Sequence, residues 1–133
     1  MIFRCYSKID ETICLEFLPC KNTGENITWE EWHGKKPLTV FFTDYRQLLL
    51  EYICGIYPIK NITNNKIIDN FDECFDNWIG KDDWKKIMEK IKLKINRTNN
   101  RPQKMEKEFY ENFIEWIEKE LEWADIIVVD GNL

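Results

Sequence analysis

The chain has 133 residues, a length that supports one domain with a buried core of its own. Hydrophobic residues make up 44% of it and aromatic residues 14%, which excludes a disordered chain. The formal net charge is −5, and this charge is spread very unevenly along the sequence. We therefore expect one globular domain over residues 1–133.

Two strands are expected near the start of the chain. Residues 2–9 are compatible with a strand. Residues 12–18 show the alternation of a half-buried strand, because Leu15 and Phe17 alternate with more polar neighbours. The two residues between these segments suit a tight antiparallel hairpin. Pro19 is expected to end the second strand, since proline has no N–H to donate to a ladder.

The rest of the chain reads as mostly helical. Apolar residues recur with the period of a helix at 45–57, 67–78, 84–95 and 102–123. Asp82 or Asp83 is expected to cap the third of these helices. Unbroken apolar runs at 38–42 and 126–129 predict short buried strands. The order predicts an α+β domain: a small, mostly antiparallel sheet, made of the early hairpin and the C-terminal strand, covered by three to four helices.

Charged residues are sorted into blocks. Residues 69–83 hold six acids against one lysine, and residues 105–133 hold nine acids against two lysines. The first acidic block also contains aromatic residues, and this mixture predicts a docking surface for a basic partner. The surface is expected to consist of Asp69, Asp72, Glu73, Asp76, Trp78, Asp82 and Asp83. The Glu-rich face of residues 106–122 is the alternative docking surface.

A basic block lies between the two acidic ones. Residues 84–104 hold eight bases against one glutamate. Nucleic-acid binding is the less favoured explanation, because the adjoining acids would repel phosphates. Pairing within the molecule, or a solvated helix face, accounts for these bases better.

The sequence predicts no catalytic residue and no bound cofactor or metal ion. His33 is the only histidine, and a small enzyme that uses it with Glu30 and Glu31 is the alternative. No motif of a hydrolase, a metalloprotease or a phosphate-binding loop accompanies it. A zinc site of Cys14, Cys20 and His33 is a less favoured alternative, since the cysteines form no Cys-x-x-Cys pair.

The location of the protein follows from what its apolar runs and cysteines allow. No apolar run approaches the ~20 residues of a membrane span, and the first residues do not have the apolar stretch of a signal peptide. Five scattered cysteines favour a reducing compartment. We expect a cytoplasmic protein.

Residues 71–84 (FDECFDNWIGKDDW) and 123–132 (WADIIVVDGN) resemble parts of small bacterial immunity proteins, the partners of polymorphic toxins, including those of contact-dependent growth inhibition systems. The resemblance implies a cytoplasmic protein that binds and neutralises the C-terminal toxin domain of a matching effector, often a nuclease. No functional residue carries over, because toxin-binding surfaces diverge between such proteins.

The leading hypothesis is therefore an immunity protein that blocks a basic toxin domain by binding, without turnover. An adaptor or regulatory module that binds a cellular protein is a further alternative. No nucleic acid, membrane or small-molecule substrate is expected as a partner.

Overall fold

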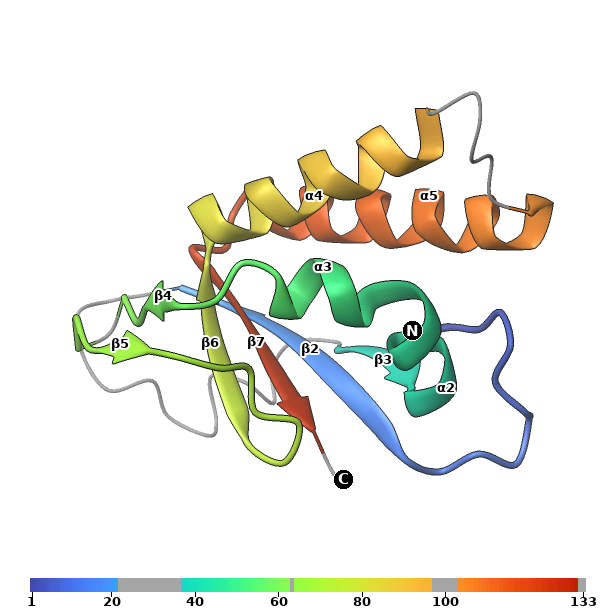
Figure 1. Cartoon of the computed structure of the whole chain (residues 1–133), viewed down its shortest axis with the longest axis horizontal. Coiled ribbons are helices and arrows are strands. Elements are labelled where there is room, and N and C mark those ends of the chain that lie inside the picture. The colour runs from blue at the N-terminus through green and yellow to red at the C-terminus, as the bar shows by residue number, and fades with distance from the viewer. Residues whose placement is uncertain (22–36, 63, 97–102, 132–133) are drawn as a thin grey trace.

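A five-stranded sheet with helices on one side forms the centre of the structure (Figure 1). This computed structural model describes residues 1–21, 37–62, 64–96 and 103–131. The strands of the large sheet are β1 (Ile2–Phe3), β2 (Cys14–Cys20), β3 (Leu38–Phe41), β6 (Asp76–Gly80) and β7 (Ile126–Gly131). A separate pair is formed by β4 (Ile59–Lys60) and β5 (Ile67–Ile68).

The large sheet has the strand order β1-β3-β2-β7-β6 and is mixed. Strand β1 runs parallel to β3, whereas the β2–β3, β2–β7 and β6–β7 pairs are antiparallel. The α+β class is confirmed. The expected small, mostly antiparallel sheet is wrong, because the sheet has five strands and includes a parallel pair.

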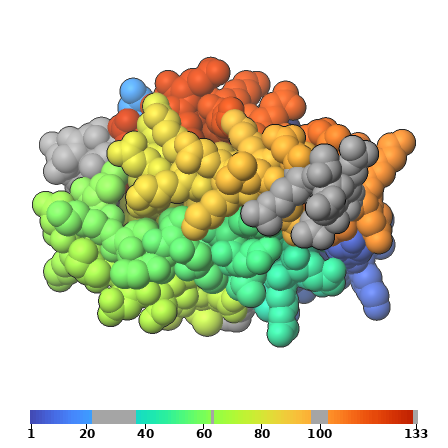
Figure 2. Space-filling model, turned by 45° about the horizontal axis from the view of Figure 1, so that its top comes forward, coloured from blue at the N-terminus to red at the C-terminus, as the bar shows by residue number. Residues whose placement is uncertain are grey.

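Within the described ranges, three helical segments cover one face of this sheet. The first comprises α2 (Phe42–Asp44), a π-helical turn η1 (Tyr45–Leu49) and α3 (Leu50–Cys54). The others are α4 (Lys81–Asn96) and α5 (Lys104–Glu120). Figure 2 shows α4 on the surface between α3 and α5. No helix within the described ranges is long and apolar enough to cross a membrane.

The helix boundaries follow from local chemistry. Helix α5 begins with a capping box, in which the Gln103 and Glu106 side chains each bond the backbone of the other residue. Asp82 and Asp83 lie in the first turn of α4, where carboxylates favour the positive end of the helix dipole. Helix α4 starts two to three residues earlier than expected, at Lys81, so neither aspartate is its cap.

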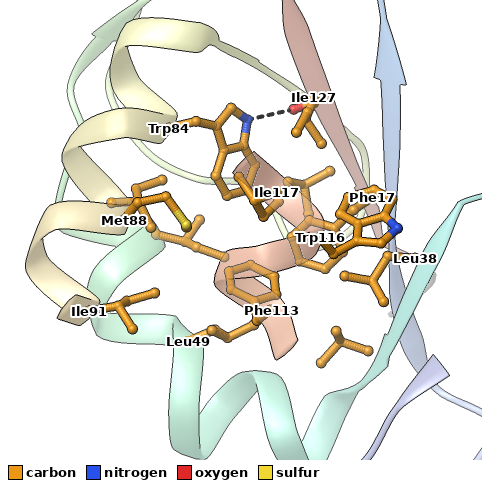
Figure 3. Close-up of a cluster of buried hydrophobic side chains, with 14 of the residues drawn as sticks. Phe17, Leu38, Leu49, Trp84, Met88, Ile91, Phe113, Trp116, Ile117 and Ile127 are labelled. Atoms are coloured by element: carbon orange, nitrogen blue, oxygen red, sulfur yellow. Dashed lines mark hydrogen bonds between the residues drawn. The ribbon is translucent and has the colours of Figure 1, made fainter. Parts of the chain in front are cut away.

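The main core lies between the sheet and the helices (Figure 3). Phe17 of β2 packs against both Trp84 of α4 and Phe113 of α5, with ring centroids 5.9 and 5.5 Å apart. The Trp84 indole also donates a hydrogen bond of 3.0 Å to the carbonyl oxygen of Ile127 in β7. Phe17 and Trp84 together therefore join two helices to two strands.

The opposite face of the sheet carries a smaller apolar cluster. Its buried members are Leu18, Cys20, Ile126 and Val128, and half-buried Trp78 packs against them. Alternate residues of β7 thus point to opposite faces, and both sets are buried. This explains why residues 126–129 form an unbroken apolar run, and the expected strand there is confirmed.

The expected hairpin of residues 2–9 and 12–18 is wrong. Only Ile2 and Phe3 form a strand, and they pair with β3. The backbone N–H groups of Cys5, Tyr6 and Ser7 all donate to the buried Asp44 carboxylate, over 2.5–3.1 Å. Because Asp44 occupies these donors, the segment is held against the start of the first helical segment and cannot form a ladder with β2.

Pro19 does not end β2, contrary to expectation, because its missing donor points away from β7 and faces no described strand. Asp125 donates its N–H to the Cys20 carbonyl over 3.1 Å, so the polar backbone groups of Cys20 face β7. The backbone groups of Pro19 point to the opposite edge of β2, toward the side of β3. Phe17 is the last β2 residue that pairs with β3, so Pro19 lies past the end of that pairing.

The expected helix at 67–78 is also wrong. This segment forms β5, a turn and the start of β6. The spacing of its apolar residues is compatible with one face of a helix. In the structure, however, Asn77 and Ile79 are alternate residues of strand β6, which pairs with β7, and both are buried. The helices expected at 45–57, 84–95 and 102–123 are confirmed, with shifted ends.

Replacing Trp84 with alanine should lower the free energy of unfolding by ~3–5 kcal/mol, because the fully buried ring fills the core and holds Ile127. Urea unfolding followed by circular dichroism measures this loss. Leu93→Ala on the exposed side of the same helix is the matched control and should change stability by less than ~0.5 kcal/mol. Equal effects of the two changes would contradict this core.

Candidate functional site

The acidic segment 69–83 lies along β6, an edge strand of the sheet. Asp69, Asp72 and Asp76 are exposed at or before its start. Asp82 and Asp83 follow its end, and Asp83 lies 3.7 Å from the Lys86 ammonium. A five-residue strand is roughly 15 Å long. The six predicted acids therefore form two groups at opposite ends of β6, with Trp78 in the middle of the strand, and not one patch.

A buried amide positions the first group. The Asn77 side chain donates to the carbonyl oxygens of Asp72, Phe75 and Val129, and accepts a hydrogen bond of 2.8 Å from the Asp72 N–H. The Asp72 carboxylate in turn accepts the Cys74 N–H over 2.9 Å. These bonds hold the turn before β6 against β7, so the exposed acids there stand on a fixed backbone.

Glu73 turns inward, away from its acidic neighbours. Its carboxylate accepts a 3.1 Å hydrogen bond from the Tyr45 hydroxyl, which also lies 3.7 Å from the Cys54 sulfur. Burial raises the pKa of the Tyr45 phenol well above its ordinary value, and the contacts with Cys54 and Glu73 add to this shift. Glu73 therefore connects the turn to the first helical segment.

Trp78 is half-buried on the face of the sheet opposite the described helices. Its ring packs against the smaller apolar cluster, so its first contacts are within the molecule. The side chain that stands out from this region is Phe75, which is 70% exposed and precedes Asp76 directly.

Three carboxylates line up across adjacent strands on that same face. Glu16 of β2 is the register partner of Asp130 in β7, and Asp130 is the partner of Asp76 in β6. Side chains of directly paired residues point to the same face of a sheet. The structure therefore forms an acidic row, defined as Glu16, Asp130 and Asp76, and two of its members lie outside the predicted block.

Burial and the proximity of Asp130 together shift the pKa of Asp76 in the acidic row. Burial raises the pKa of the Asp76 carboxyl from 3.8 to about 6, and the hydrogen bond and charge of Asp130 add to the shift. Burial also raises the pKa of the Cys14 thiol, with further contributions from Glu16 and Asp130. Like charges directly opposite one another destabilise a sheet, so this row costs stability in the isolated protein.

The other charged surfaces are partly neutralised within the molecule. On α4, Lys92 pairs with Glu118 of α5, and Lys94 lies 4.0 Å from Glu51. On α5, Lys107 lies 4.0 Å from Glu111. These contacts agree with the expected internal pairing of the basic block, and they reduce the free charge of the Glu-rich face.

Nothing in the described ranges forms a metal site, because no group of three or more histidine, cysteine or acidic side chains is placed to hold an ion. Cys14 and Cys20 lie at opposite ends of β2, roughly 20 Å apart, too far to share one zinc ion. His33, Glu30 and Glu31 lie outside the described residues.

Comparisons of this chain with protein-family models, with curated proteins and with solved structures find no match. The functional argument therefore depends on the surface of this molecule alone.

Stability should depend on pH through Asp76. Its pKa is raised in the native state, so the native state binds more protons than the unfolded chain between about pH 4 and about pH 6. The free energy of unfolding should therefore fall as the pH rises through this window. Asp76→Asn should remove this fall and stabilise the protein by less than ~1 kcal/mol above the window, since solvent screens the exposed group.

Urea unfolding of both proteins at about pH 4 and about pH 8 tests the difference. Asp69→Asn, which removes an exposed charge from the same segment, is the control and should have similar small effects at both values. An Asp76→Asn effect that is identical at the two pH values would show that the carboxyls of Asp76 and Asp130 do not interact.

Proposed function

We propose that this chain is a cytoplasmic immunity protein, which binds a cognate toxin domain and blocks it without turnover. The observation that carries the proposal is the acidic row on the face of the sheet opposite the described helices. Three carboxylates in register on neighbouring strands repel one another, and a partner with arginines or lysines would relieve that repulsion.

The chemistry of a nuclease fits this surface. An enzyme that cuts nucleic acid must hold phosphates, so it is commonly basic around its active site. A row of carboxylates can occupy such a groove in place of the phosphates. Opposite charge also accelerates encounter and disfavours wrong partners. The exposed ring of Phe75 beside the row supplies apolar contact that would slow dissociation.

The predicted residues take different parts in this surface. Asp72 lies on the turn that Asn77 holds, just before the row, and Asp69 is exposed three residues earlier in the chain. Asp82 and Asp83 take part only if the partner spans the whole of β6. Glu73 and Trp78 make contacts within the molecule, so they would support the surface more than they touch the partner.

Two alternatives remain distinct from this proposal. An adaptor could use the same acidic row on a cellular protein. A small enzyme would depend on His33 with Glu30 and Glu31. A cell-based protection assay separates all three.

The assay needs a candidate toxin, which is the C-terminal domain of a large secreted effector if one is encoded directly upstream of the gene for this chain. A bacterial strain then expresses that domain. Co-expression of the chain should restore growth, and the purified proteins should form a stable complex. His33→Ala should protect equally well, because inhibition needs no catalytic residue. Growth that is not restored, with no complex formed, would refute the proposed function. Loss of protection by His33→Ala with normal binding would favour the enzyme.

A charge variant locates the binding surface. The triple variant Glu16→Gln, Asp76→Asn, Asp130→Asn should slow association with the toxin domain and weaken its dependence on salt. We expect an effect on the association rate of roughly tenfold at low ionic strength, because exposed charges act mainly on encounter. Stopped-flow fluorescence or surface plasmon resonance measures the rate.

The matched control removes three charges from the Glu-rich face of α5: Glu108→Gln, Glu111→Gln, Glu118→Gln. It should leave most of the association rate unchanged. If this control slows association while the variant of the acidic row does not, the partner docks on α5.

A further inference from the structure

Helices α4 and α5 lie side by side and run in opposite directions (Figure 1). Helix α4 carries six lysines against three acids, a net charge of +3. Helix α5 carries six glutamates against three lysines, a net charge of −3. The exposed side of Lys81–Asn96 and Lys104–Glu120, here called the two-helix surface, therefore has a basic half and an acidic half.

Two hollows follow the seam between the helices, with volumes of about 420 and about 430 Å³. Lys85 of α4 and Glu122, just past the end of α5, line the first hollow, together with Glu89 of α4. Lys92 of α4 and Glu115 of α5 line the second. All five of these residues are exposed. At each of the two levels along the seam, a base on one helix is thus matched by an acid on the other.

These charges are only partly neutralised within the molecule. Lys92 pairs with Glu118 across the seam. Among the described residues, no ion pair involves Lys85, Glu115 or Glu122. The two-helix surface therefore keeps charges of both signs available, separated into its two halves.

We propose that the two-helix surface binds a second copy of this chain, in a dimer whose twofold axis runs parallel to the helices. Rotation about this axis places α4 of each copy on α5 of the other. Lys85 and Lys92 of one copy then face Glu122 and Glu115 of the other copy. The proposal goes beyond the function above, because it needs neither the acidic row nor a toxin. The row lies on the opposite face of the sheet, so the dimer leaves it accessible.

Symmetry and charge together select this arrangement. In a twofold dimer both copies use the same surface. An axis across the helices would place α4 on α4 and α5 on α5, so that like charges face each other. An axis along the helices places opposite charges together instead. It also keeps every residue at its own level along the seam, so the base and acid that are matched within one molecule meet again between the two copies.

The same pattern disfavours a partner of uniform charge. A uniformly basic protein would meet like charge over α4, and a uniformly acidic one would meet it over α5. A second copy carries both signs at the matching spacing: Lys85 and Lys92 are seven residues apart, as are Glu115 and Glu122. Seven residues are about two helical turns. The chain is therefore complementary to itself.

The size of the surface predicts a weak dimer. The 16 residues of α4 are roughly 24 Å long, and two adjacent helices are roughly 20 Å wide. Each copy would bury roughly 500 Å², at the low end of specific interfaces. Exposed ion pairs contribute little individually and are screened by salt. We expect a dissociation constant of roughly 10–100 µM at low ionic strength, weakened by about tenfold in about 0.5 M salt.

Charge reversal tests the pairing. The first variant carries Lys85→Glu and Lys92→Glu, and the second carries Glu115→Lys and Glu122→Lys. Each variant alone should be monomeric where the unchanged chain dimerises, because its four positions then carry charges of one sign. An equal mixture of the two variants should form a heterodimer, because every facing pair is again of opposite sign. Sedimentation velocity measures the mass of each species.

The matched control reverses two exposed charges away from the two-helix surface, Lys60→Glu and Lys66→Glu. It should dimerise like the unchanged chain. Circular dichroism checks that every variant keeps its fold. Recovery on mixing is the decisive result, since two misfolded variants would not restore each other.

Three results would overturn the proposal: a chain that stays monomeric at about 1 mM in low salt, a dimer that the reversals do not weaken, or variants that do not associate when mixed. If the chain is monomeric and the second variant slows association with the toxin domain, the two-helix surface binds the toxin instead. The protection assay does not require self-association, so failure of the dimer is distinguishable from failure of the proposed function.

Discussion

The structure depends on an interior strand that is apolar on both faces. Strand β7 pairs with β2 on one side and β6 on the other, and buries Ile127 and Val129 against the helices. Ile126 and Val128 are buried in the cluster on the opposite face. A strand of this kind must lie inside a sheet with both faces covered, since exposing either set would cost apolar burial. The last described strand of the chain therefore organises the segments that precede it.

The same strand connects the core to the acidic row. Val129 accepts a hydrogen bond from Asn77, which holds the turn before β6, and Asp130 follows immediately in the middle of the row. The row thus stands on a well-packed support. Charges on rigid strands lose little freedom when a partner binds, so their cost in the free protein can be recovered in a complex.

Helices α4 and α5 were predictable because their apolar residues recur over many turns. Four buried residues of α4, among them Trp84 and Ile91, all follow the expected stripe. Short segments carry less information. The apolar residues of 67–78 fit one side of a helix as well as they fit strands and a turn, and the choice depended on Val129, which lies 52 residues from Asn77 in the chain. The hairpin failed for a similar reason, since Asp44 takes the backbone donors of residues 5–7.

The sequence by itself determined the α+β class, the three long helical segments, the buried C-terminal strand and the acidic character of the segment 69–83. These follow from composition and periodicity, which are local properties. Only the tertiary structure decided that Glu16 and Asp130 join Asp76 and that Glu73 turns inward. The physical reason is register: strand pairing brings together residues more than 50 positions apart, and no local pattern encodes which pairs will meet.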